Sequence, residues 1–157
     1  MTYGMAQGGR HNVPFASIKS IDIVKNETLI KAFEKKQEEF KARSFKKTSH
    51  EIIYAYHGTN SNVIDKILQE NFDINKAHRQ AHGRGNYFSE FPATALGYSD
   101  QKALIFCKIL PGKQYKGPNM TWDGYDSKLV APDHNDVSQM VIIQNKDQIL
   151  PCGVIHF

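Results

Sequence analysis

Two short segments carry side chains able to bind a polar ligand. The first is His-Gly-Thr at 57–59, directly after an apolar run at 52–56. The second is 83–89, a Gly-x-Gly turn that leads into Tyr-Phe. A glycine beside each strand lets a ligand approach the backbone closely, because no Cβ stands in the way. We therefore predict that His57 and Tyr87 lie at neighbouring strand ends and face one cleft.

Length and composition indicate one globular domain. The chain has 157 residues, of which 40% are apolar and 23% charged, which excludes a disordered protein. No run reaches the ~18 apolar residues of a membrane span. Residues 1–12 are polar and glycine-rich and lack the pattern of a signal peptide. We expect a disordered lead at 1–12, a folded domain at 13–157 and an intracellular location, cytoplasmic or nuclear.

Charged and metal-ligating residues elsewhere favour structural roles. The net charge is +4, and much of the excess lies in 31–47, where lysines alternate with glutamates. Such spacing is typical of a solvated helix face, and nucleic-acid binding is the alternative. Cys107 and Cys152 are too few for a disulfide framework and predict reduced thiols. His78 and His82 have the spacing of a helical zinc site, but no third ligand follows, so we predict no metal.

The hydrophobic patterns predict an α+β domain. Strands and helices do not alternate regularly, which favours an antiparallel or mixed sheet over a parallel one. A loop rich in polar and basic residues at 73–84 is expected to be functional. Strands are predicted at 17–25, 51–56, 87–88, 102–110, 139–143 and 153–157. Helices are predicted from Asn26 to an end between Arg43 and Ser49, from 60 or 61 to Asn71 and over 92–100.

The chain resembles the catalytic domain of the poly(ADP-ribose) polymerase family, the diphtheria-toxin-like ADP-ribosyltransferases. The resemblance implies an ADP-ribosyltransferase fold, with a mostly antiparallel split sheet and a few flanking helices. The length leaves no room for a helical regulatory subdomain, as in the tankyrase and macrodomain-linked branches. The motifs that carry the resemblance, in family order and spacing, are Tyr56-His57-Gly58-Thr59, 83–89, Tyr98, Tyr125-Asp126-Ser127 and Gln148-Ile149-Leu150-Pro151.

The resemblance implies a reaction and a set of NAD contacts. The family cleaves the nicotinamide–ribose bond of NAD, its substrate, and passes ADP-ribose to a nucleophile. The implied contacts are His57 with a ribose hydroxyl, Gly58 with the nicotinamide amide through its backbone, Thr59 with the adenosine ribose, Tyr87 and Tyr98 on either side of the nicotinamide ring, and Arg79 or Arg84 near the phosphates.

One departure from the family pattern concerns its catalytic glutamate. Counting back from Gln148, with one extra residue allowed in the intervening turn, places Gln139 at that position. A slip of one residue gives Ser138 or Met140, and neither is a carboxylate. The nearest acid, Asp136, would need a slip of three, which conflicts with the alternation of side chains along a strand.

The loss of this carboxylate predicts single transfer rather than polymer formation. A neutral Gln139 can hydrogen-bond ribose but cannot act as a base, and one lost electrostatic partner costs roughly 2.7–4 kcal/mol in other enzymes. An acidic acceptor could supply its own carboxylate; serine-only acceptors would then react more slowly. Ala95 also stands where the family commonly has a serine that bonds the nicotinamide amide, so we expect weaker NAD binding.

Three functions therefore remain open. The first is a mono-ADP-ribosyltransferase that modifies an acceptor protein, including this chain itself. The second is a catalytically inactive NAD pocket or interaction module, which the residues at 95 and 139 favour. The third is hydrolysis of NAD to ADP-ribose, or transfer to a nucleic-acid end, for which the basic segment 31–47 is the supporting feature. None of the three involves a metal or a membrane.

Overall fold

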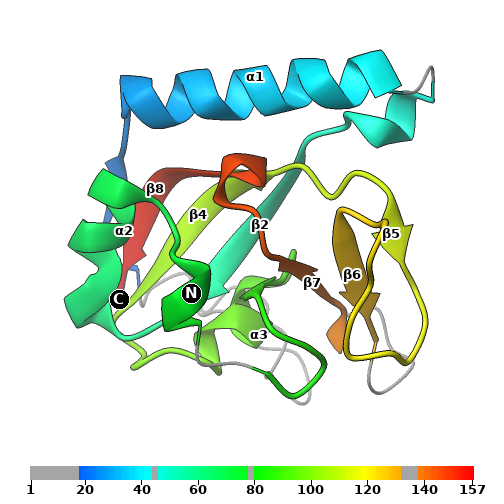
Figure 1. Cartoon of the computed structure of the whole chain (residues 1–157). Helices are drawn as coiled ribbons and strands as arrows, with labels where there is room; N and C mark the ends of the chain where they lie inside the picture. The colour runs from blue at the N-terminus through cyan, green and yellow to red at the C-terminus, as the bar shows by residue number, and fades with distance from the viewer. Residues whose placement is uncertain (1–17, 44–45, 78–79, 132–137) are drawn as a thin grey trace.

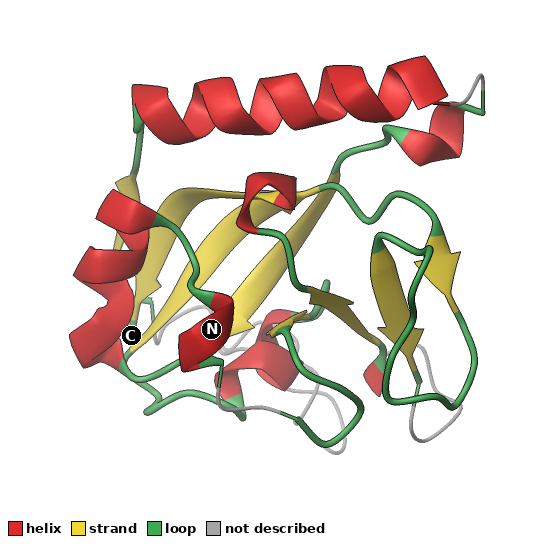
Figure 2. Ribbon diagram, in the orientation of Figure 1, coloured by secondary structure: helices red, strands yellow, loops and turns green. Residues whose placement is uncertain are grey.

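Two four-stranded sheets lie side by side and make up the centre of the molecule (Figure 1, Figure 2). The structure, a computed structural model, describes residues 18–43, 46–77, 80–131 and 138–157. The first sheet has the order β1 (Ser20–Ile23), β8 (Ile149–His156), β4 (Ala103–Ile109) and β2 (Ile53–Gly58). The second has the order β3 (Asn86–Phe88), β7 (Met140–Ile143), β6 (Ser127–Val130) and β5 (Gln114–Tyr115).

Strand pairing is antiparallel throughout both sheets except between β5 and β6. The predicted α+β fold with a mostly antiparallel split sheet is therefore confirmed. One long helix, α1 (Glu27–Arg43), and several shorter helices and turns surround the sheets, and Figure 2 shows α1 along the top of the view. The shorter ones are α2 (Ile64–Glu70), α3 (Pro92–Leu96) and the 3-10 turns η2 (Lys47–Ser49), η3 (Ser61–Val63), η4 (Ile74–Lys76) and η6 (Lys146–Gln148).

Helix α1 forms where its capping residue and apolar spacing predict it. The Asn26 side chain accepts a hydrogen bond from the Leu29 N–H at 3.3 Å, which satisfies a donor that the helix leaves unpaired. Leu29, Phe33 and Phe40 fall on one face and are buried in a cluster with Leu110 and Leu150. Figure 1 shows the helix running across one end of the first sheet, so its apolar face covers that end.

The main core lies between the two sheets and beneath α2. The side chains of β4 alternate, so that Ile105, Cys107 and Ile109 pack with Phe88 and Ile143 in one cluster. Both cysteines are free thiols, as predicted. Burial raises the pKa of the Cys107 thiol well above its usual value, which keeps that thiol protonated and inert.

Several elements differ from the sequence prediction. Strand β2 extends through His57 and Gly58 because both residues pair with β4. Helix α3 ends at Leu96 rather than near residue 100. The Ser99 hydroxyl donates a hydrogen bond to the Leu96 carbonyl at 2.7 Å and so caps this end of the helix. Strand β6 lies outside the strands predicted from the sequence. Val63 lies within the helix predicted from 60 or 61 to Asn71, but it is 42% exposed and part of a 3-10 turn at 61–63.

Some sequence predictions lie outside the described residues. These are the disordered lead at 1–12 and the roles weighed for His78, Arg79 and Asp136.

A carboxylate and an amide join α1 to both sheets. Asp126 accepts two hydrogen bonds from the Arg43 guanidinium, at 3.1 and 2.8 Å, and one from the Lys113 N–H at 2.8 Å. The buried Gln148 amide donates to the Asp126 carbonyl at 2.9 Å. Ser127 donates to a backbone carbonyl at 2.7 Å. The motif residues Asp126, Ser127 and Gln148 are therefore structural anchors of the domain.

We expect Asp126→Asn to lower the free energy of unfolding by about 1–3 kcal/mol, because hydrogen bonds to a charged acceptor are lost from a largely buried side chain. Denaturant unfolding measures this change. Glu38→Gln is the matched control, since it removes the charge of an exposed ion pair with Lys41 and should cost less than about 1 kcal/mol. Equal effects of the two substitutions would contradict the anchoring role.

Candidate functional site

The two sheets meet at one pair of residues, Tyr56 on β2 and Ser89 just after β3. The Tyr56 N–H donates to the Ser89 carbonyl at 2.7 Å, and the Ser89 N–H donates to the Tyr56 carbonyl at 3.0 Å. This bridge brings His57 next to Tyr87, as the sequence predicted.

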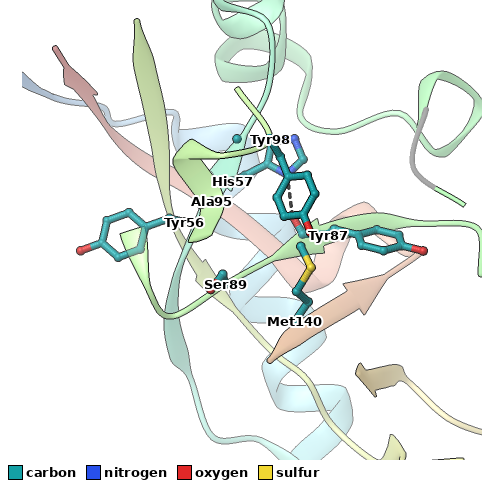
Figure 3. A pocket seen from close by; sticks show the side chains of 8 residues that line it. Tyr56, His57, Tyr87, Ser89, Ala95, Tyr98 and Met140 are labelled. Atoms are coloured by element: carbon teal, nitrogen blue, oxygen red, sulfur yellow. Dashed lines mark hydrogen bonds between the residues drawn. The ribbon is translucent and has the colours of Figure 1, made fainter. Parts of the chain in front are cut away.

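His57 is held in a defined tautomer by the opposite strand. Its Nδ1 lies 2.8 Å from the Tyr87 carbonyl oxygen, drawn as a dashed line in Figure 3. A carbonyl oxygen only accepts, so Nδ1 carries the proton and Nε2 is the acceptor nitrogen of the neutral ring. The ring packs edge-on against Phe72, with centroids 4.8 Å apart, and against Phe88 at 5.4 Å. These contacts fix the direction in which Nε2 can accept a hydrogen bond.

Gly58 presents its backbone polar groups to the same cleft. In an antiparallel strand both polar groups of a residue point to one edge, and the edge alternates along the strand. Tyr56 bonds Ser89 at the edge away from β4, so Gly58, two residues further, directs its N–H and C=O to that edge as well. A Cβ at Gly58 would overlap the carbonyl oxygen of Ala95. Only glycine therefore fits between β2 and α3.

A narrow cavity lies at this junction. Its volume is about 10 Å³, roughly the space of one water molecule. Tyr98, 39% exposed, stands at its border. The described residues that line the cavity include no carboxylate, lysine or arginine. They are Tyr56, His57, Gly58, Tyr87, Ser89, Ala95, Tyr98 and Met140, most of them labelled in Figure 3.

The two tyrosines predicted to enclose a nicotinamide ring are oriented differently. Figure 3 shows the Tyr98 ring beside the cavity, with the Met140 side chain pointing toward it, while the Tyr87 ring is turned away. The Tyr87 hydroxyl donates to the Gly83 carbonyl at 2.6 Å and accepts from the His82 N–H at 3.0 Å. Tyr87 thus borders the cavity, while its ring anchors the preceding turn.

The cavity wall contains Met140, and not Gln139, which the sequence analysis assigned to the catalytic position. Strand β7 begins at Met140, and its pairing sets Tyr87 opposite Ile142. Extending this register places Met140 opposite Ser89, and both line the cavity. Gln139 precedes the strand and is absent from the described lining. A count back from Gln148 without the extra turn residue gives Met140.

The other predicted NAD contacts lie outside this lining. Thr59 is half-buried just beyond β2. Arg84 is exposed, and its guanidinium donates to the Asn75 side chain at 3.0 Å, so it is directed toward η4. The structure therefore brings together His57, Gly58, Tyr87 and Tyr98.

An aspartate ties the two walls of the cleft together. Asp100, two residues after Tyr98, accepts hydrogen bonds from the Ser61 hydroxyl at 2.6 Å and the Ser61 N–H at 2.9 Å. These bonds, the hydroxyl first, lower the pKa of the Asp100 carboxyl below its usual value. They hold the turn after Gly58 against the end of α3. Sequence reasoning missed this pair, because the spacing of the two residues carries no signal.

The described residues contain no group of three or more His, Cys, Asp or Glu placed to hold a metal ion. Within the same residues, no helix combines the length and apolar character needed to cross a membrane.

The comparison with known families identifies the class of protein. A family model described as the poly(ADP-ribose) polymerase catalytic domain matches residues 4–155. The chain belongs to this family. Membership implies an ADP-ribosyltransferase domain whose substrate is NAD, in agreement with the predicted class and substrate.

Two characterised relatives are mono-ADP-ribosyltransferases by name. The human protein mono-ADP-ribosyltransferase PARP12 is 24% identical over 159 residues, which cover 92% of this chain and 22% of that protein. The mouse protein mono-ADP-ribosyltransferase PARP12 is 25% identical over 111 residues, which cover 67% of this chain and 16% of that protein. The chain thus spans about a fifth of the length of these relatives.

We expect Gly58→Ala to abolish measurable NAD binding and to destabilise the domain by about 1–3 kcal/mol, the range for overpacking, because its methyl group must displace α3. Calorimetric titration with NAD and thermal unfolding measure the two effects. Gly97→Ala is the matched control, since its Cβ would lie 3.4 Å from the nearest atom, the Thr94 carbonyl oxygen, in a helical backbone conformation. Normal NAD binding by Gly58→Ala would exclude the backbone role of Gly58.

Proposed function

We propose that this chain transfers a single ADP-ribose unit from NAD to an acceptor protein. One observation carries the proposal: the cavity that joins His57 and the Gly58 backbone has Met140 in its wall. We infer that Met140 occupies the position of the family's catalytic glutamate. A thioether cannot act as a base toward a second ribose hydroxyl. The names of the two PARP12 relatives support single transfer.

The geometry supports binding of the nicotinamide end of NAD. The carboxamide of nicotinamide has one acceptor and one donor edge, which complement the N–H and C=O of Gly58. Nε2 of His57 accepts a hydrogen bond from a ribose hydroxyl, since Nδ1 already donates to the Tyr87 carbonyl. The nicotinamide ring is far larger than a cavity of about 10 Å³. Its entry therefore requires Tyr98, the exposed member of the wall, and the flexible Met140 to move.

The proposed chemical step moves positive charge from the pyridinium ring of NAD to the ribose. The bond between nicotinamide nitrogen and ribose C1 breaks, and its electron pair neutralises the pyridinium. The ribose is left oxocarbenium-like until an acceptor side chain attacks C1 and loses its proton. With Met140 in the wall, no carboxylate of the described lining stabilises this cation, so an acidic acceptor that brings its own carboxylate is favoured.

An inactive NAD pocket or interaction module is the second candidate. Two observations favour it, the small cavity volume and the presence of Ala95 and Met140 in place of polar residues. The same transfer assay separates the two functions.

We expect labelled NAD to mark the wild-type protein or an acceptor in a lysate by single units, and His57→Ala to lose this labelling. Met140→Glu should raise the turnover number at least about tenfold, because a carboxylate then stabilises the cation. Met140→Gln is the matched neutral control, and Gln139→Glu should change the rate by less than about twofold, since residue 139 lies outside the wall.

Two outcomes would oppose this view. If wild type binds NAD but transfers nothing, the inactive module is the better description. If Gln139→Glu raises the rate and Met140→Glu does not, residue 139 holds the catalytic position after all.

We also expect Ala95→Ser to tighten NAD binding, because Ala95 lines the cavity beside Gly58 and a hydroxyl there can bond the carboxamide. One hydrogen bond is worth about 0.5–1.5 kcal/mol, or about two- to twelvefold in Kd. Calorimetric titration with NAD measures the change. Ala95→Cys, similar in size but a weak donor, is the control. A Kd equal to that of wild type would show that position 95 does not face the amide.

A further inference from the structure

Strand β6 carries a lysine in an unusual environment. Lys128 is only 3% exposed, and none of the ion pairs among the described residues includes it. Its ammonium group instead donates to two backbone carbonyls, that of His82 at 2.7 Å and that of Asn119 at 2.6 Å. It also lies 5.9 Å from the ring centroid of Trp122. Two loops far apart in sequence are thus joined through one cation.

Burying this ammonium is costly unless its donors are satisfied, and burial lowers the pKa of the Lys128 side chain. The two carbonyls offset part of that cost, since hydrogen bonds from a charged donor are stronger than neutral ones. They do so only when the turn at His82 and the loop at Asn119 converge on one point. The lysine therefore restricts where both segments can lie.

The turn held by Lys128 is the one that carries Tyr87. The His82 N–H donates to the Tyr87 hydroxyl at 3.0 Å, and that hydroxyl donates to Gly83 at 2.6 Å. On its other side, the turn packs so closely on Trp122 that a Cβ at Gly83 would overlap the indole ring. The turn is fixed from one side by Tyr87 and from the other by Lys128 and Trp122.

We propose that Lys128 is a positioning residue for NAD binding, which holds the turn at 82–85 in its binding geometry without contacting the nucleotide. The proposal rests on the proposed function. Lys128 is absent from the described lining of the cavity, so it acts through the turn and Tyr87. Without the ammonium, the turn must be ordered when NAD binds, which weakens binding and leaves the chemical step unchanged.

The test compares Lys128→Met, which keeps the length of the side chain, with Lys128→Arg, which keeps its charge. Lys113→Met is the matched control, because Lys113 is an exposed lysine whose ammonium lies 4.8 Å from the Tyr125 ring centroid. Calorimetry gives the NAD Kd independently of transfer, and steady-state kinetics give KM and kcat. Trp122, the single tryptophan of the chain, reports on the loop by fluorescence.

We expect Lys128→Met to raise Kd and KM by about five- to tenfold, the cost of ordering a few groups on binding, with kcat unchanged and the Trp122 emission shifted to the red. Lys128→Arg should restore most of the affinity, and Lys113→Met should behave as wild type. If Lys128→Met fails to fold, Lys128→Gln, which retains one donor group, takes its place with a smaller expected effect.

Three results would overturn the proposal. One is an unchanged Kd in Lys128→Met despite altered Trp122 emission, and another is a loss of kcat in place of affinity. The third is a wild-type protein that does not bind NAD, which would also remove the proposed function. A wild type that binds NAD without transferring ADP-ribose would remove the proposed function alone, because the Kd comparison still tests Lys128.

Discussion

The rest of the site depends on two backbone hydrogen bonds between Tyr56 and Ser89. They join the free edge of β2 to the chain that leaves β3, and so help to place the two sheets relative to each other. This bridge determines the positions of His57 and Gly58 in the cleft. It places the Tyr87 carbonyl within reach of His57, which selects the imidazole tautomer, and it directs the polar groups of Gly58 away from β4. A ligand amide then meets a donor and an acceptor that need no rearrangement.

The described lining of the cavity carries no carboxylate, lysine or arginine, and this sets the limits of its chemistry. A wall without charged side chains solvates neutral nicotinamide better than the positively charged pyridinium ring of NAD, which would favour release of the leaving group. The same wall offers the developing ribose cation no counter-charge. Met140 and Ala95 line this wall without contributing a charge. This lining is the basis of our proposal of a single transfer in which the acceptor supplies the carboxylate that the wall lacks.

The charged residues that matter most to the structure lie behind the cleft. Asp126 accepts hydrogen bonds from the Arg43 guanidinium and from the Lys113 N–H. The Lys128 ammonium donates hydrogen bonds to two backbone carbonyls. Each side chain is largely buried and uses its charge to hold loops that have little apolar surface of their own. The motif around Asp126 carries the family resemblance, yet its geometry serves the scaffold. A sequence motif can therefore identify a family through residues that lie outside the described lining of the candidate site.

The sequence by itself determined the class of fold, the family, and the placement of His57 and Tyr87 at one cleft. The fold and this placement depend on local signals: the apolar run of β4, the cap at Asn26, and glycines beside strand ends. Only the tertiary structure showed that Met140, and not Gln139, lines the cavity, because a shift of one residue turns a side chain to the other face of a strand. It also decided the roles of Lys128 and Asp100, whose partners lie far away in sequence.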